Sequence, residues 1–153
     1  MEVRTPLFDR LVDRAPKLRN EPRPQRTLDR QGYRESVRRE LERLLNTRCP
    51  VPVHRLADRP RSVIDYGLPE LTGFSANRVE DRDRLAELIR RTIEAFEPRL
   101  AEIRVRLEQI PGDSLSLGGH LEGLLTFDGV TEPVSFQTAV ETRTGKVEID
   151  AGA

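Results

Sequence analysis

The sequence predicts an α+β fold in which N-terminal helices pack on a C-terminal antiparallel β-meander. Up to residue 96 the apolar residues recur at intervals of three and four, whereas from residue 103 they alternate with polar residues. Helices followed by a run of strands with short turns are typical of the α+β class. A chain of 153 residues is long enough for one domain with a single core.

The first 28 residues are predicted to form a flexible arm that precedes a single domain over residues 29–150. Prolines at positions 16, 22 and 24 lie among arginines and polar residues, and they prevent a regular helix there. A short apolar group before them is spaced like an amphipathic turn that docks on the protein or on a partner: Leu7, Phe8, Leu11 and Val12. We favour docking within the chain, or disorder, over a dedicated binding peptide.

The first helix is predicted over residues 33–46. Its apolar stripe comprises Tyr33, Val37, Leu41, Leu44 and Leu45. Its outward face carries Arg34, Arg38, Arg39, Glu42 and Arg43. A basic helix can bind nucleic acid, but glutamates are interleaved with these arginines and the pI is near 6.8. We therefore predict a solvated, partner-facing surface and no nucleic-acid partner.

A capped turn and a second helix follow. Ser62 is placed to cap a short turn that runs to Tyr66 and is stopped by Gly67. Asn77 and Glu80 have the spacing of a capping box before the helix. The apolar stripe of this second helix comprises Leu85, Leu88, Ile89, Ile93 and Phe96.

The second helix is predicted to end at a rigid corner formed by Glu97, Pro98 and Arg99. Pro98 has no N–H and disfavours a helical conformation at Glu97, so a charged pair flanks a stiff joint. We interpret the three residues as a protein-binding site, because a rigid corner lowers the ordering cost of a contact. The alternative is a clasp between Glu97 and Arg99 over the helix end.

Four strands are predicted after the corner: residues 103–108, 115–127 and 134–142, and a short one around Val147 and Ile149. Turns at 111–113, 128–129 and 144–145 separate them. An exposed edge strand offers unpaired backbone groups to another chain, and the short last strand is our candidate for this edge.

Catalysis and cofactor binding find little support in the sequence. Neither the two histidines nor Cys49 has the spacing of a metal site, and no glycine loop precedes a helix to hold phosphate. Glu97 could be a general acid if buried, but Arg99 would favour its ionised form. No apolar run approaches the roughly 18 residues of a membrane span. We expect no enzyme, no cofactor, no metal and no direct membrane insertion.

Three motifs, in order, resemble the TssE family of type VI secretion baseplate proteins, relatives of the contractile-phage baseplate wedge subunit. They are residues 44–48 (LLNTR), 62–69 (SVIDYGLP) and 96–100 (FEPRL). The resemblance spans roughly residues 33–149 and implies a small α+β domain similar to the handshake domain of sheath proteins. It also implies that Glu97, Pro98 and Arg99 form a subunit contact.

The resemblance implies a structural adaptor that links the baseplate wedge to the contractile sheath and helps to initiate sheath assembly. The implied partners are the wedge proteins TssF and TssG, with TssK nearby, and the TssB and TssC sheath. The implied location is cytoplasmic, at the cytoplasmic face of the inner membrane. The family is also described as lysozyme-like, so a peptidoglycan-cleaving glycoside hydrolase is a disfavoured alternative, and a phage-like tail baseplate protein is another.

Overall fold

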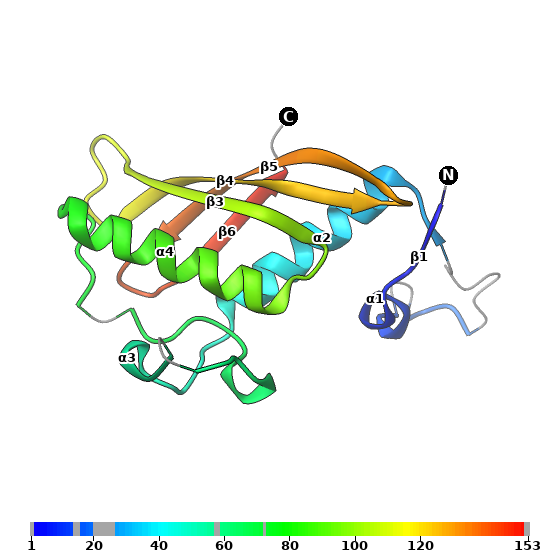
Figure 1. Cartoon of the computed structure of the whole chain (residues 1–153), viewed down its shortest axis with the longest axis horizontal. Helices are drawn as coiled ribbons and strands as arrows, with labels where there is room; N and C mark the ends of the chain where they lie inside the picture. The colour runs from blue at the N-terminus through cyan, green and yellow to red at the C-terminus, as the bar shows by residue number, and fades with distance from the viewer. Residues whose placement is uncertain (1, 14–15, 20–26, 57–58, 72, 152–153) are drawn as a thin grey trace.

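The computed structural model confirms the α+β class (Figure 1). It describes residues 2–13, 16–19, 27–56, 59–71 and 73–151. The helical elements are α1 (Leu7–Leu11), α2 (Arg30–Asn46), α3 (Val53–Leu56), the 3-10 turn η1 (Val63–Asp65) and α4 (Val79–Phe96). The strands are β1 (Val3–Arg4), β2 (Thr27–Leu28), β3 (Leu100–Gln109), β4 (Ser116–Phe127), β5 (Val130–Glu141) and β6 (Val147–Ala151).

The four C-terminal strands form one antiparallel meander in the order β3-β4-β5-β6. Two of its cross-strand rows can be followed through the whole sheet, one from Arg106 to Asp150 and one from Glu108 to Glu148. The first row contains Arg106, His120, Gln137 and Asp150, and the second contains Glu108, Gly118, Ala139 and Glu148. A bulge lies between Ala101 and Arg104, and Glu102 within it has φ 51°.

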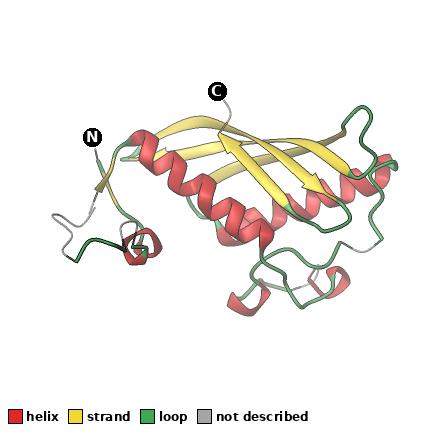
Figure 2. Cartoon of the chain, turned by 180° about the vertical axis from the view of Figure 1, so that it is seen from behind, coloured by secondary structure: helices red, strands yellow, loops and turns green. Residues whose placement is uncertain are grey.

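Both long helices cover one face of this sheet, so the fold has two layers (Figures 1 and 2). Helix α4 packs on β3 and α2 packs on β6. The inward residues of the strands alternate as predicted and meet the helix stripes in one core, in which Val37, Leu85 and Phe136 are fully buried. Cys49 is buried.

The helix starts differ from the predicted ones. Helix α2 begins three residues earlier than predicted, where Asp29 is the N-cap and its Oδ1 accepts a hydrogen bond from Gly32 N at 2.7 Å. The predicted capping box at α4 is wrong, because the N-cap is Arg78 and makes no side-chain cap. Asn77 Oδ1 instead accepts a hydrogen bond from Gln109 Nε2 at 2.9 Å, which ties the helix start to the end of β3.

One row of the polar face of α2 is not solvated, contrary to our prediction, because it runs along the edge of the sheet. Asn46 Nδ2 donates to Val147 O at 2.7 Å, and Val147 N donates to Asn46 Oδ1 at 3.0 Å. One and two turns earlier along this row lie Glu42 and Arg38, and Arg38 Nη1 donates to Ile149 O at 2.7 Å. Arg34 Nη2 donates to Ser135 O at 3.1 Å, where β6 has ended.

The short last strand is therefore not the open edge that we predicted. The backbone groups of Val147 and the carbonyl of Ile149 already have partners on α2. Side chains four residues apart on a helix lie on one face, so a single row of α2 seals the edge formed by β5 and β6.

The N-terminal segment lies at one end of the molecule in both views (Figures 1 and 2). Strands β1 and β2 pair antiparallel, with Val3 opposite Leu28. Helix α1 contacts α2 through Asp9 and through the ring of Phe8, which lies against Arg43. The predicted apolar group does not pack on the core, because Leu7, Phe8, Leu11 and Val12 are all exposed. Residues 14–15 and 20–26 of the predicted arm lie outside the described residues, and the boundary between residues 28 and 29 stays a prediction.

Candidate functional site

The corner between α4 and β3 places the three predicted site residues in different environments. Helix α4 ends at Phe96, and Glu97 N closes its last turn on Ile93 O at 2.8 Å. Glu97 is 2% exposed, Pro98 is exposed and Arg99 is half-buried. The proline cannot continue the helix, and β3 starts at Leu100.

Glu97 and Arg99 form a clasp over the helix end. Arg99 Nε donates to Glu97 Oε1 at 2.7 Å, and Arg99 Nη2 donates to Glu97 Oε2 at 2.5 Å. Arg99 N donates to Glu97 Oε1 at 3.2 Å. This fork-to-fork geometry is the strongest form of an arginine-carboxylate pair. Burial opposes the charge of Arg99, but the bonds to Glu97 outweigh it and raise the pKa of Arg99.

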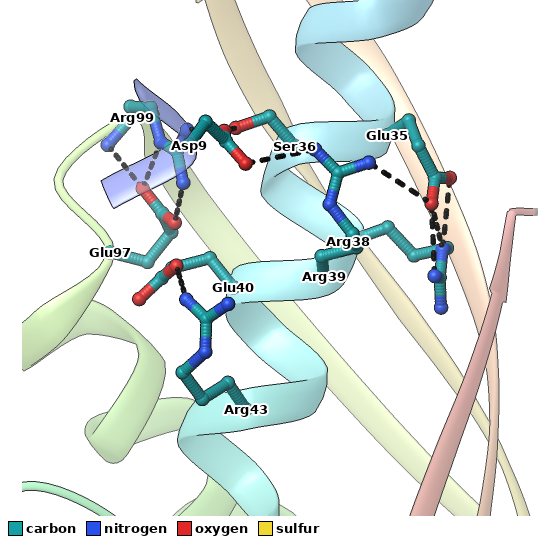
Figure 3. A network of polar contacts seen from close by, with 9 residues as sticks. All are labelled: Asp9, Glu35, Ser36, Arg38, Arg39, Glu40, Arg43, Glu97 and Arg99. Atoms are coloured by element: carbon teal, nitrogen blue, oxygen red, sulfur yellow. Dashed lines mark hydrogen bonds and ion pairs between the residues drawn. The ribbon is translucent and has the colours of Figure 1, made fainter. Parts of the chain in front are cut away.

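The clasp is the centre of a network that reaches the N-terminal helix (Figure 3). Arg99 Nη1 donates to Ser36 Oγ at 3.1 Å, and Ser36 Oγ donates to Asp9 Oδ2 at 2.5 Å. Arg39 Nη2 donates to the other oxygen of Asp9 at 2.9 Å. The guanidinium carbon of Arg99 also lies 5.6 Å from the ring centroid of Tyr33. Residues 9, 36 and 99 therefore connect three separate elements.

A second set of contacts surrounds this network. Arg43 Nη1 donates to Glu40 Oε2 at 2.5 Å (Figure 3). The guanidinium carbon of Arg43 also lies 3.8 Å from the ring centroid of Phe8. Tyr66 OH donates to Glu40 Oε1 at 3.4 Å. Burial, followed by the negative charge of Glu40, raises the pKa of Tyr66 to about 12. The Tyr66 ring packs edge-on against Phe96, directly before the corner.

Sequence reasoning missed Ser36 and Asp9. Ser36 is a buried polar residue on the side of α2 that faces the core, and a single serine inside a helical pattern carries no distinctive signal. Asp9 lies 27 residues from its Ser36 partner, so no local spacing could have paired them. The clasp itself was one of the two alternatives drawn from the sequence, and it is present.

The geometry offers little to an enzyme mechanism. Both carboxylate oxygens of Glu97 accept bonds from Arg99 within an almost completely buried side chain, whereas a general acid must reach its substrate. In the described part of the chain no three histidines, cysteines or carboxylates are grouped to hold a metal ion. None of the described helices is both long and apolar enough to cross a membrane.

These observations define a class: a small two-layer α+β domain with a charged clasp at the corner between its second long helix and its sheet. The family model of baseplate wedge protein gp25 matches residues 31–129, and the chain belongs to this family. The matched segment runs from α2 through the corner to the turn between β4 and β5.

The chain is similar to a chain of "The baseplate complex from the type VI secretion system", with 23% identity and a TM-score of 0.48. The alignment covers 72% of this chain and 96% of that chain. No curated protein matches the chain.

Proposed function

We propose that this protein is a non-enzymatic component of the type VI secretion baseplate that links the wedge to the contractile sheath and helps to initiate sheath assembly. Membership of the baseplate wedge protein gp25 family supports a structural role in a baseplate. The proposed partners are TssF, TssG and TssK on the wedge side and TssB and TssC on the sheath side. The proposed location is the cytoplasmic face of the inner membrane.

The observation that carries the sheath link is an asymmetry between the two edges of the meander. In an antiparallel sheet, the backbone N–H and C=O groups of successive residues point alternately toward one neighbouring strand and toward the other. The backbone groups of Val147 and Ile149 point toward α2, so those of Glu148 and Asp150 point toward β5. The same alternation, followed along the two cross-strand rows, shows that the backbone groups of Arg106 and Glu108 in β3 point toward β4.

The backbone groups of Val105 and Leu107 must then point away from the sheet. Within the described residues no hydrogen bond reaches either backbone from outside β3 and β4. Strand β3 is therefore the open edge, and it can accept an extended segment of another chain by β-augmentation. Its charged neighbours, Arg104 and Arg106, discourage indiscriminate pairing, as edge strands commonly do.

The wedge contact is proposed at the corner. Pro98 and the exposed side of Arg99 would touch the partner, while Glu97 would act through Arg99 by fixing the guanidinium. A side chain that is already held loses less entropy when it binds, so the clasp and the contact are compatible.

A single proline substitution at the open edge tests the sheath link. Val105→Pro removes an outward N–H without removing a β3-β4 hydrogen bond, and Val105→Ala is the matched control that keeps the N–H. We expect Val105→Pro to stop the chain from nucleating TssB and TssC polymers, as measured by light scattering and electron microscopy. Normal nucleation by folded Val105→Pro would contradict the proposed edge.

A further inference from the structure

Helix α1 is amphipathic, but its apolar side faces away from the domain. Leu7 and Leu11 lie four residues apart on one side of the helix, and they are 69% and 73% exposed. Asp9 lies on the opposite side, where its carboxylate contacts α2 (Figure 3). The side chain of Asp9 is only 12% exposed. The main attachment of α1 to α2 is therefore a carboxylate and not an apolar face.

The surface that receives α1 is a stripe of three residues on one side of α2. Ser36, Arg39 and Arg43 follow one another at intervals of three and four residues, which places them on a single side of the helix. Ser36 Oγ donates to Asp9 Oδ2 at 2.5 Å, and Arg39 Nη2 donates to Asp9 Oδ1 at 2.9 Å. The guanidinium carbon of Arg43 lies 3.8 Å from the ring centroid of Phe8. We call these three residues of α2 the α2 stripe.

Ser36 and Arg39 together require an anionic acceptor. Ser36 is 3% exposed, and its Oγ already accepts a hydrogen bond from Arg99 Nη1 at 3.1 Å. The hydroxyl proton then needs an acceptor of its own, because a buried donor without one is costly. Among the described residues Arg39 has one other carboxylate partner, Glu35, and that contact of 3.7 Å is too long for a hydrogen bond. A carboxylate between the two donors satisfies both.

Arg43 selects an aromatic residue beside that carboxylate. Its Nη1 donates to Glu40 Oε2 at 2.5 Å, which holds the guanidinium over the ring of Phe8. The face of an aromatic ring carries partial negative charge and attracts such a cation. Phe8 and Asp9 are adjacent in the chain, so the α2 stripe fits an aromatic residue followed by a carboxylate.

Helix α1 is held weakly enough for another segment to replace it. It has five residues and none of them is buried, and a helix of this length is not stable without external contacts. Segments with few buried apolar contacts open locally at a low free-energy cost. The pairing of Val3 and Arg4 with β2 keeps α1 near the stripe, so an incoming segment has to compete with a tethered one.

We propose that the α2 stripe binds a short segment of a wedge protein in which an aromatic residue precedes a carboxylate, and that Phe8 and Asp9 occupy this site in the free protein. The partner segment would replace α1 and would lie beside the corner, because Ser36 also binds Arg99. The choice of a wedge protein rests on the proposed function, whereas the chemistry of the segment rests on the contacts of Phe8 and Asp9.

A synthetic peptide of residues 6–13 tests the site without a partner protein. The full chain with Phe8→Ala and Asp9→Ala should bind this peptide at least about tenfold more tightly than the natural chain, because the tethered competitor is lost. Fluorescence anisotropy of the labelled peptide measures this, and circular dichroism verifies folding. A peptide with Leu7→Ser and Leu11→Ser is the matched control and should bind equally well, whereas a peptide with Asp9→Ala should not bind.

An added change in the stripe tests its charge. In the Phe8→Ala, Asp9→Ala chain, Arg39→Glu should abolish peptide binding, because it replaces a donor to the carboxylate with a like charge. Equal peptide binding by the natural chain and the Phe8→Ala, Asp9→Ala chain would overturn the proposed site, as would binding that survives Arg39→Glu.

Binding to a purified TssF–TssG complex, measured by calorimetry, tests the partner. The Phe8→Ala, Asp9→Ala chain should bind several-fold more tightly than the natural chain, and a Leu7→Ser, Leu11→Ser chain should bind like the natural one. Unchanged or weaker binding by the Phe8→Ala, Asp9→Ala chain would overturn the replacement of α1 while leaving the proposed function intact. If neither chain bound the complex although the peptide behaved as expected, the proposed wedge partner would be wrong and the site itself would stand.

Discussion

Glu97 and Arg99 stabilise each other, because each would otherwise leave a charge in a largely buried position. Removing one partner from such a pair is more costly than removing both. We expect Glu97→Ala to lower the free energy of unfolding by roughly 2 kcal/mol, and the double variant with Arg99→Ala to cost less than the two single changes added together. Urea unfolding of the four proteins measures the coupling. Additive costs would indicate that the clasp contributes little.

Asp65 should make stability depend on pH. The hydrogen bond from Ser62 N, together with Arg59, lowers its pKa in the folded protein from 3.8, so the stabilisation is fully present above that value and is lost as the pH falls through the folded pKa. We expect Asp65→Asn to be less stable than the natural chain at pH 7, and this difference to shrink below about pH 4. Thermal unfolding between pH 2.5 and 7 measures it. A difference independent of pH would mean that the charge of Asp65 is unimportant.

At the residue scale, the features that depend only on neighbouring residues could be predicted from the sequence. The Ser62 turn, its stop at Gly67 and the end of α4 before Pro98 depend on neighbouring residues, and all three are confirmed. The partners of Arg99 beyond Glu97 depend on how α2 and α1 approach the corner. The spacing of residues along the chain does not predict how these two helices pack at the corner.

Helix α2 shows the same limit at the scale of elements. Its apolar stripe was predictable, because burial follows the helical period. Arg34 and Arg38 were misinterpreted as solvated, because the sequence does not reveal that this side of the helix meets a sheet edge. The row Arg34, Arg38, Glu42 and Asn46 is identifiable only once the edge is in place.

Opening this edge should change how the protein associates. Arg38→Ala with Asn46→Ala would leave the backbone of Val147 and the carbonyl of Ile149 without their α2 partners. We expect a loss of stability of about 1–3 kcal/mol and concentration-dependent self-association through β6, measured by analytical ultracentrifugation. Arg90→Ala with Arg91→Ala on α4 is the control, because it also removes ion pairs but no edge cap. A monomeric Arg38→Ala, Asn46→Ala variant would contradict the sealing role.

At the scale of the whole molecule, the two edges of the sheet differ in whether they can pair with another chain. One side is closed by the protein's own helix, and on the other side the outer edge of β3 has no strand partner among the described residues. The corner begins this same strand, and the bulge at Glu102 separates it from the open part. A single strand would thus carry the wedge contact at its start and the sheath contact further along.

This separation predicts that the two proposed contacts can be lost independently. Arg99 and Val105 are six residues apart on an extended strand, which corresponds to roughly 20 Å, and sites at that distance normally act additively. We expect Val105→Pro to lose the sheath proteins but keep TssF–TssG, and a folded Glu97→Ala, Arg99→Ala variant to do the reverse. Co-purification of all components with each variant measures this, and combining the changes should remove both partners. If either variant alone lost both partners, the two contacts would have to share one surface, and β3 could not join wedge to sheath in the way proposed.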